Sequence, residues 1–162
     1  GVAHLASQKP AEAQSWLQRG LSRFPNDPAL RDELASFYKK QAADRFSQGK
    51  FQDAQPLLEA MLALDASPAA VGSDGYSLVR QNYARLKNNR EAARLLEKEL
   101  LKNPGSINLA SDISTIYHDY LYDYARAYQV LGEEKDLASG KAAADFIRRR
   151  LYDEKSGVLL RR

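Results

Sequence analysis

The chain has 162 residues, enough for one ordinary domain or for about four pairs of helices. Its hydrophobic content of 44% can supply a packed core, and the absence of cysteine excludes disulfides, thiolate metal sites and a cysteine nucleophile. The net charge of +3 is modest and concentrated at positions 148–150 and 161–162, so it does not indicate a nucleic-acid-binding protein. No apolar run is long enough to predict a membrane span.

Two helices are predicted in the first part of the chain. The first begins at Pro10 and runs to about Arg23, because a first-turn proline has no helical N–H partner to lose. The second is long and covers residues 28–48, where apolar residues recur every three or four positions. Seven residues make almost two complete turns, so the extra length keeps the apolar stripe on one side.

The middle of the chain is predicted to alternate between helices and short connections. A helix begins at Phe51, and Pro56 near its first turn is tolerable there. Residues 67–75 are rich in proline, glycine and serine and are predicted to form a loop. Ser106 is a predicted N-cap for the helix that follows it. Further helices are predicted at residues 76–87, 90–103, 107–122, 123–132 and 137–154.

A motif with a small residue at the start of a helix recurs along the chain. Ala13, Ala54, Ala92 and Ala127 open successive second helices at intervals of roughly 35–41 residues. Internal repetition at such a period is typical of a solenoid, in which each unit buries its apolar face on the next. The sequence therefore predicts an all-α solenoid.

Further positions carry a resemblance to a known repeat family. Gly49 lies between two helices, Tyr83 and Tyr117 lie near the ends of first helices, and Pro25 and Pro104 close units. On these residues the chain resembles the tetratricopeptide repeat family over roughly residues 1–134. The Trp, Leu and Gly signature of that family's first helix is mostly absent. The resemblance implies a right-handed superhelix of about four antiparallel helical hairpins.

The predicted organisation is a repeat domain at residues 1–154 followed by a tail at 155–162. A C-terminal capping helix is expected at 137–154, because it is apolar on one side and charged on the other. The first hairpin looks cut, and Val158 and Leu159 look unpaired, so we expect the chain to continue into a longer protein. The repeat units are predicted at about residues 1–27, 28–68, 73–106 and 107–134.

The sequence offers few groups for catalysis. His4 and His118 are the only histidines, and no second histidine is placed to complete a site with His118, Asp119 and Asp123. No glycine-rich phosphate loop, nucleophile elbow or zinc-protease helix is present. We therefore predict no enzyme, no metal site and no cofactor, with an enzyme using His118 as the remaining catalytic alternative.

The resemblance implies that first helices of successive units line a concave groove that holds a peptide. Lys39, Lys40 and Arg85 could receive carboxylates through charge-assisted hydrogen bonds. The alternative is that these are ordinary solvated polar positions. Matched to the family, the predicted groove residues are Ser36, Lys39, Lys40, Ser77, Gln81, Arg85, Ser111, Thr115 and His118.

Tyrosines crowd the predicted turn that follows Tyr117. Tyrosine joins a large apolar face to a hydroxyl, which favours it at interfaces. A second candidate binding surface is predicted at Tyr120 and Tyr122. In the alternative interpretation Tyr117, Tyr124 and Tyr128 are packing residues and Tyr120 and Tyr122 are partly exposed.

The favoured hypothesis is a non-catalytic scaffold that binds a peptide or protein segment in the concave groove. The alternative is an assembly or spacer segment of a larger envelope or secretion-type complex. In this hypothesis the chain docks through its outer face and through the corner at Tyr120 and Tyr122, which we call the Tyr-rich corner. The expected partner is a protein or peptide, without nucleic acid or membrane insertion. The oligomeric state is open, and the cytoplasm and the periplasm are both allowed.

Overall fold

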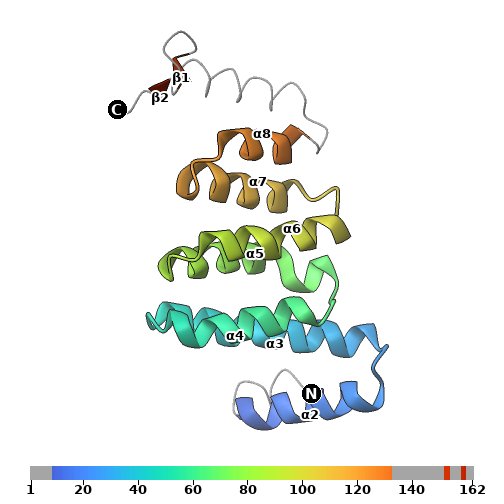
Figure 1. Cartoon of the computed structure of the whole chain (residues 1–162). Helices are drawn as coiled ribbons and strands as arrows, with labels where there is room; N and C mark the ends of the chain where they lie inside the picture. Colours follow the sequence, from blue (N-terminus) through green and yellow to red (C-terminus); the bar gives the residue numbers. More distant parts are fainter. Residues whose placement is uncertain (1–8, 133–151, 154–157, 160–162) are drawn as a thin grey trace. The chain divides into compact units, whose positions relative to one another are not determined.

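The computed structural model describes residues 9–132, 152–153 and 158–159, and nearly all of them are helical. This confirms the predicted all-α class. Residues 1–8, including His4, lie outside the described part. The helices are α2 (Pro10–Arg23), α3 (Pro28–Ser47), α4 (Phe51–Ala63), α5 (Pro68–Arg85), α6 (Asn89–Lys102), α7 (Ile107–Thr115), the π-helix η1 (Ile116–Tyr120) and α8 (Tyr124–Gly132) (Figure 1).

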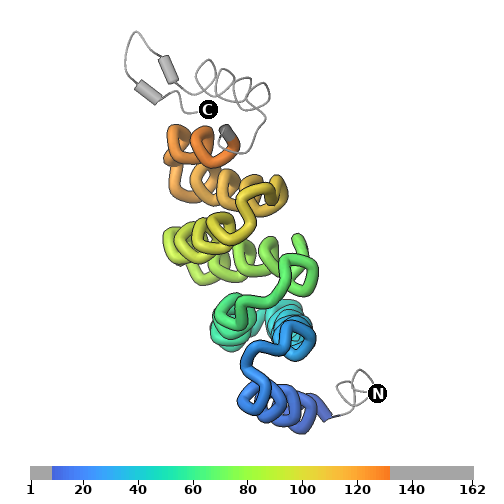
Figure 2. Tube along the Cα trace, turned by 90° about the vertical axis from the view of Figure 1, so that its right-hand side faces the viewer, coloured from blue at the N-terminus to red at the C-terminus, as the bar shows by residue number. Residues whose placement is uncertain are grey.

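The chain divides into two compact units, Gly1–Lys87 and Asn88–Arg162. In the first unit, α3 packs against α2, α4 and α5, and α4 also packs against α5. Short turns join these successive helices, as the tube in Figure 2 shows. The core of this unit is built from Ala13, Leu17, Leu34, Ala35, Phe37, Tyr38, Ala42, Ala54, Leu58, Met61, Leu62, Val71, Tyr76, Val79 and Tyr83.

The long helix α3 begins and ends where its sequence signals lie. The Asp27 carboxylate accepts hydrogen bonds from the Ala29 and Leu30 backbone N–H groups, and Pro28 occupies the first turn. At the other end Gly49 has φ 74°, a left-handed conformation that costs glycine little and stops the helix. The predicted long helix is therefore confirmed, one residue shorter than expected.

The predicted loop at residues 67–75 is wrong, because α5 begins at Pro68. The Ser67 hydroxyl accepts a hydrogen bond from the Ala70 N–H, which caps a helical turn that proline starts. The helix then breaks at Gly72, with φ 71° and ψ 164°, a region of backbone space used almost only by glycine. Glycine therefore marks a kink inside a helix at this position.

In the second unit α7 packs against α6, α8 and η1, and η1 also packs against α6 and α8. Ser106 caps α7, as predicted, by accepting a hydrogen bond from the Leu109 N–H at 3.4 Å. The helix predicted to run to residue 122 is α-helical only as far as Thr115 and then widens into η1. The core contains Ala92, Ala93, Leu96, Leu109, Ala110, Ile113, Ile116, Ala127 and Val130.

The repeated alanines of the sequence motif are all buried. Ala13 and Ala54 lie in the core of the first unit, and Ala92 and Ala127 lie in that of the second. A methyl side chain lets two helix backbones approach closely, so a larger residue would force the packed helices apart. The packing role predicted for these four positions therefore agrees with their burial.

Most of the predicted capping helix at 137–154 and of the tail at 155–162 lies outside the described residues. Where the chain is described, β1 (Tyr152–Asp153) pairs antiparallel with β2 (Val158–Leu159), with Tyr152 opposite Leu159. The prediction of helix at residues 152–153 and of an unpaired segment at 158–159 is therefore wrong. Pairing gives the backbone groups of this apolar segment hydrogen-bond partners.

Candidate functional site

Lys39 fastens α3 to the kink in α5. Its ammonium group donates a hydrogen bond to the Val71 carbonyl oxygen at 2.9 Å and pairs with Asp74 Oδ1 at 3.1 Å. The side chain is only 22% exposed, so most of it is packed between the two helices. The charge of Lys39 therefore already serves an ion pair within the first unit.

The start of α5 is held by α3 as well. Asp32 accepts a hydrogen bond from the Ser67 backbone N–H through Oδ1 and another from the Ser67 hydroxyl through Oδ2, both at 2.7 Å. The first turn of α5 thus lies between two polar contacts to α3, one at Ser67 and one at Val71. These contacts fix how α3 and α5 are placed against each other.

Four predicted groove residues form what we call the α3–α5 polar face: Ser36 and Lys40 on α3, and Gln81 and Arg85 on α5. All four are exposed, and the two helices that carry them are in contact. The Arg85 guanidinium lies 5.9 Å from the centre of the Phe51 ring, a cation–π distance. The structure therefore brings these residues onto one pair of packed helices, whereas Ser77 beside them is only half-exposed.

The other three predicted groove residues lie in the second unit. Ser111 is exposed, and the Thr115 hydroxyl donates to its backbone carbonyl at 2.9 Å. His118 Nδ1 lies 2.5 Å from Asp119 Oδ1. The His118 ring packs edge-on to the Tyr124 ring, with 5.0 Å between the ring centres. The predicted nine-residue groove thus draws on both units, and it stays a prediction.

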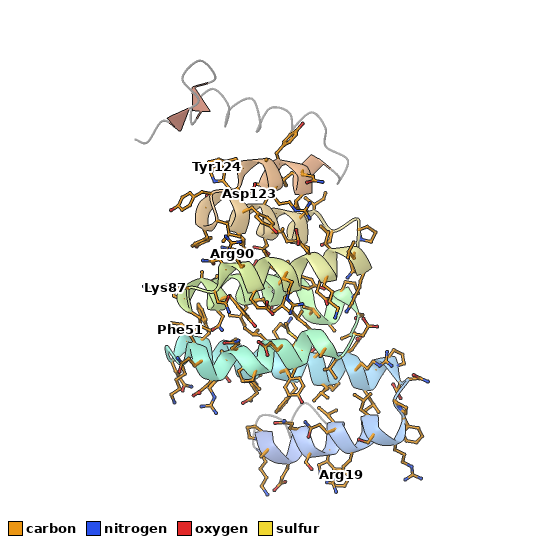
Figure 3. All side chains as sticks on the ribbon, viewed as in Figure 1. Arg19, Phe51, Lys87, Arg90, Asp123 and Tyr124 are labelled. Carbon is orange, nitrogen blue, oxygen red and sulfur yellow. The ribbon has the colours of Figure 1, made fainter. Side chains whose placement is uncertain are left out.

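An open hollow of about 390 Å³ lies at one end of the first unit. The turn before α4, the first turn of α4 and Leu86 line it, and Lys50 and Asp53 contribute opposite charges. Phe51 and Lys87, labelled in Figure 3, lie at this end of the unit. A wide hollow with one cation and one anion provides no convergent set of catalytic groups.

The carboxylate of Glu97 links three helices of the second unit. Its Oε1 accepts a hydrogen bond from Tyr117 Oη at 3.1 Å and two from Arg126, from Nε at 3.1 Å and from Nη2 at 2.8 Å. These residues come from α6, η1 and α8. One oxygen atom therefore joins three helices.

The same cluster shifts two pKa values. Burial raises the pKa of Tyr117 above its ordinary value of 10.0, and the negative charge of Glu97 raises it further. The hydrogen bond to Glu97 raises the pKa of Arg126, since it favours the charged guanidinium. At neutral pH the cluster therefore holds a protonated phenol and a charged arginine.

The tyrosines around η1 divide by exposure. Tyr120 and Tyr122 are 41% and 68% exposed, whereas Tyr117, Tyr124 and Tyr128 are half-buried. Tyr122 has φ 55°, a left-handed conformation that is uncommon for a bulky residue. This division agrees with the interpretation of three packing residues and two exposed ones.

A polar core residue escaped the sequence analysis. Asn82 is fully buried, and its Nδ2 donates to the Phe51 carbonyl oxygen at 3.0 Å. Beside it, the Tyr83 hydroxyl donates to Glu59 Oε1 at 2.6 Å, which gives the buried ring a polar partner. The sequence could have revealed it, because Asn82 lies three residues after Val79 and so on the same buried side of α5.

Within the described ranges, no three His, Cys, Asp or Glu side chains are grouped so that they could hold a metal ion. No helix in this part of the chain has both the length and the apolar character needed to cross a membrane. Comparison with protein-family models, with curated proteins and with solved structures finds no match.

Proposed function

We propose that this chain is a non-catalytic scaffold, built from repeats of the tetratricopeptide type, that binds a protein or peptide segment. The helix contacts of the first unit support this proposal, because α3 packs on both α4 and α5 and α4 also packs on α5. Such a pattern is expected of a first helix, its partner and the first helix of the next repeat. The burial of Ala54 on α4 fits the small residue that this packing needs.

The observation that carries the binding proposal is the α3–α5 polar face. Two helices in contact present exposed cations, Lys40 and Arg85, together with neutral hydrogen-bonding side chains. Cations of this kind form charge-assisted hydrogen bonds with carboxylates. The preferred ligand of the face is therefore an acidic peptide segment.

The test of this proposal is a double charge reversal, Lys40→Glu with Arg85→Glu. A partner is first captured from cells and identified, and its dissociation constant is then measured with purified protein. We expect the reversal to weaken binding about tenfold or more, because it replaces attraction by repulsion. Arg90→Glu with Lys98→Glu makes the same change of charge at exposed positions of α6 and is the matched control. Equal affinities of the wild type, the double reversal and the control would exclude the α3–α5 polar face as the binding site.

A second candidate function is supported by the exposed tyrosines of the second unit. In this alternative the chain is an assembly or spacer segment of a larger envelope or secretion-type complex and docks through the Tyr-rich corner. Tyr120 and Tyr122 present exposed rings beside a π-helix, a feature that is frequent at functional sites. Tyr120→Ala with Tyr122→Ala should then abolish association while helicity by circular dichroism stays unchanged. Retained association would leave the corner without a docking role.

A further inference from the structure

Helix α2 and Phe24, the residue that follows it, carry two aromatic rings, each with an arginine against it. The Arg19 guanidinium lies 4.5 Å from the centre of the Trp16 ring, and that of Arg23 lies 5.7 Å from the centre of the Phe24 ring. Trp16 is 67% exposed and Phe24 is 57% exposed. Figure 3 shows Arg19 on the side of α2 that faces away from α3. We call these four residues the arginine–aromatic face.

In the part of the chain that the structure describes, no acidic side chain forms an ion pair with either arginine of this face. Among the residues that the structure describes, Arg19 makes one long hydrogen bond, to the Ser15 carbonyl oxygen at 3.4 Å, and no ion pair of Arg23 is present. The nearest acidic residue of the helix, Glu12, is already paired with Lys9 at 3.1 Å. Two guanidinium groups four residues apart are therefore available on one side of α2.

The chemistry of a stacked guanidinium suits it to a carboxylate. The ring holds the plane of the group by cation–π attraction, and the N–H donors at its edge stay free to bind an anion through two parallel hydrogen bonds. Trp and Arg are also the residues that most often dominate the free energy of binding at protein interfaces. The exposed rings would gain further by losing contact with water.

We propose that the arginine–aromatic face is a second docking site, for an acidic protein segment with two carboxylates spaced about 6 Å apart beside an apolar side chain. Two uncompensated cations match two carboxylates, whereas tight binding to nucleic acid draws on about six to ten phosphate contacts. The site lies on α2 and at its C-terminal end, and it shares no residue with the α3–α5 polar face. Its partner therefore need not be the segment bound there.

Trp16 supplies the assay, since it is the only tryptophan of the chain. The probes are a short synthetic peptide of Glu, Asp and Leu, the same peptide with Gln and Asn in place of the acids, and oligothymidylate. Fluorescence of Trp16 and calorimetry are followed during titration into the full chain. We expect saturable binding of the acidic peptide and at least about tenfold weaker binding of the amide peptide. Binding should also weaken as salt is added.

Four variants assign the binding to the face. Arg19→Glu with Arg23→Glu should weaken peptide binding about tenfold or more, while the matched Arg90→Glu with Lys98→Glu should leave it within about twofold. Trp16→Ala, followed by calorimetry, should also weaken binding, with circular dichroism showing that the helices remain. Lys40→Glu with Arg85→Glu should have no effect, which separates this site from the one on α3 and α5.

Several results would overturn the proposal. One is the absence of saturable binding of the acidic peptide. Another is an equal loss of peptide affinity in the Arg19→Glu/Arg23→Glu and Arg90→Glu/Lys98→Glu variants. Unchanged affinity in Trp16→Ala would exclude the aromatic part of the site. Tighter binding of oligothymidylate than of the peptide, lost on reversal of Arg19 and Arg23, would replace the acidic protein segment by nucleic acid as the ligand.

Discussion

At the scale of single residues, each unit contains polar contacts between residues that are far apart in the sequence. Glu97 in the second unit bonds residues 20 and 29 positions away, and Lys39 in the first bonds residues 32 and 35 positions away. Each of these side chains is partly exposed, so each pair is expected to stabilise the fold modestly. Their main effect is to fix which turn of one helix faces which turn of another.

Tyr117→Phe tests the cluster around Glu97. A folded-state pKa raised above 10.0 means that the stabilising effect of the phenol is complete below about pH 10 and is lost as the pH rises through the raised value. The variant should lose about 0.5–1.5 kcal/mol at pH 7, the usual contribution of one hydrogen bond. Its stability should then fall less steeply than that of the wild type above pH 10. Urea unfolding between neutral and alkaline pH measures both effects, with Tyr122→Phe, at an exposed ring, as the control.

Gly72→Ala tests the kink in α5. A methyl group there would clash with the Asp74 carboxylate and approach Lys39 Nζ to 3.3 Å, and φ 71° with ψ 164° is unfavourable for alanine. We expect a loss of about 1–3 kcal/mol in the free energy of unfolding. Gly49→Ala, with φ 74° but open space around it, should cost less, and Gly105→Ala should be nearly neutral. The opposite order in urea unfolding would contradict the strain assigned to Gly72.

At the scale of elements, helix starts were the most predictable feature. Pro10 and Pro28 each stand in a first turn, and local chemistry alone places them there. The turn from Pro68 to Val71 was missed because its composition is that of a loop, and its contacts come from Asp32 and Lys39, more than 30 residues away. The sequence analysis did not predict η1 either, and η1 packs against α6 and α8.

The candidate site was predictable to a similar degree. Exposure of Lys40, Gln81 and Arg85 follows from helical periodicity and agrees with the structure. The contacts of Lys39 could not be foreseen, because they require the kink at Gly72. Pairs such as Glu97 with Arg126 join separate helices, and helical periodicity does not show which residues meet between helices.

Asp27→Ala tests the capping of α3. Removing the carboxylate leaves the Ala29 and Leu30 N–H groups without their acceptor, which should cost about 1 kcal/mol of stability. Asn88 stands at the same position before α6 but makes no capping hydrogen bond, so Asn88→Ala should have a smaller effect. Thermal unfolding followed by circular dichroism compares the two. Equal shifts in the midpoint would show that the Asp27 cap contributes little.

At the scale of the whole molecule, the chain consists of two units that each bury their own apolar surface. In the first unit, Leu34 from α3, Leu58 and Met61 from α4 and Val79 from α5 are almost fully buried, and these three helices pack on one another. In the second, Leu96, Ile113 and Ile116 are buried in the same way.

Residues 1–87 expressed alone test this division. We expect a helical circular dichroism spectrum and cooperative urea unfolding, because the core helices α3, α4 and α5 are all retained. Leu58→Ala in this fragment should cost about 2–5 kcal/mol, as for other buried leucines, whereas Gln52→Ala at an exposed position should be nearly neutral. An unfolded fragment would contradict the independence of the first unit.

The two polar contacts that α3 makes to the first turn of α5 also limit how the gene can change. Asp32 and Lys39 lie seven positions apart, so they stand almost two full turns from each other on nearly the same side of the helix. Inserting or deleting one codon between them would swing one side chain by about 100° and detach it from α5. A change of seven residues would restore the direction but move Lys39 by about 10 Å along α3, so the spacing between Asp32 and Lys39 should tolerate no change in length.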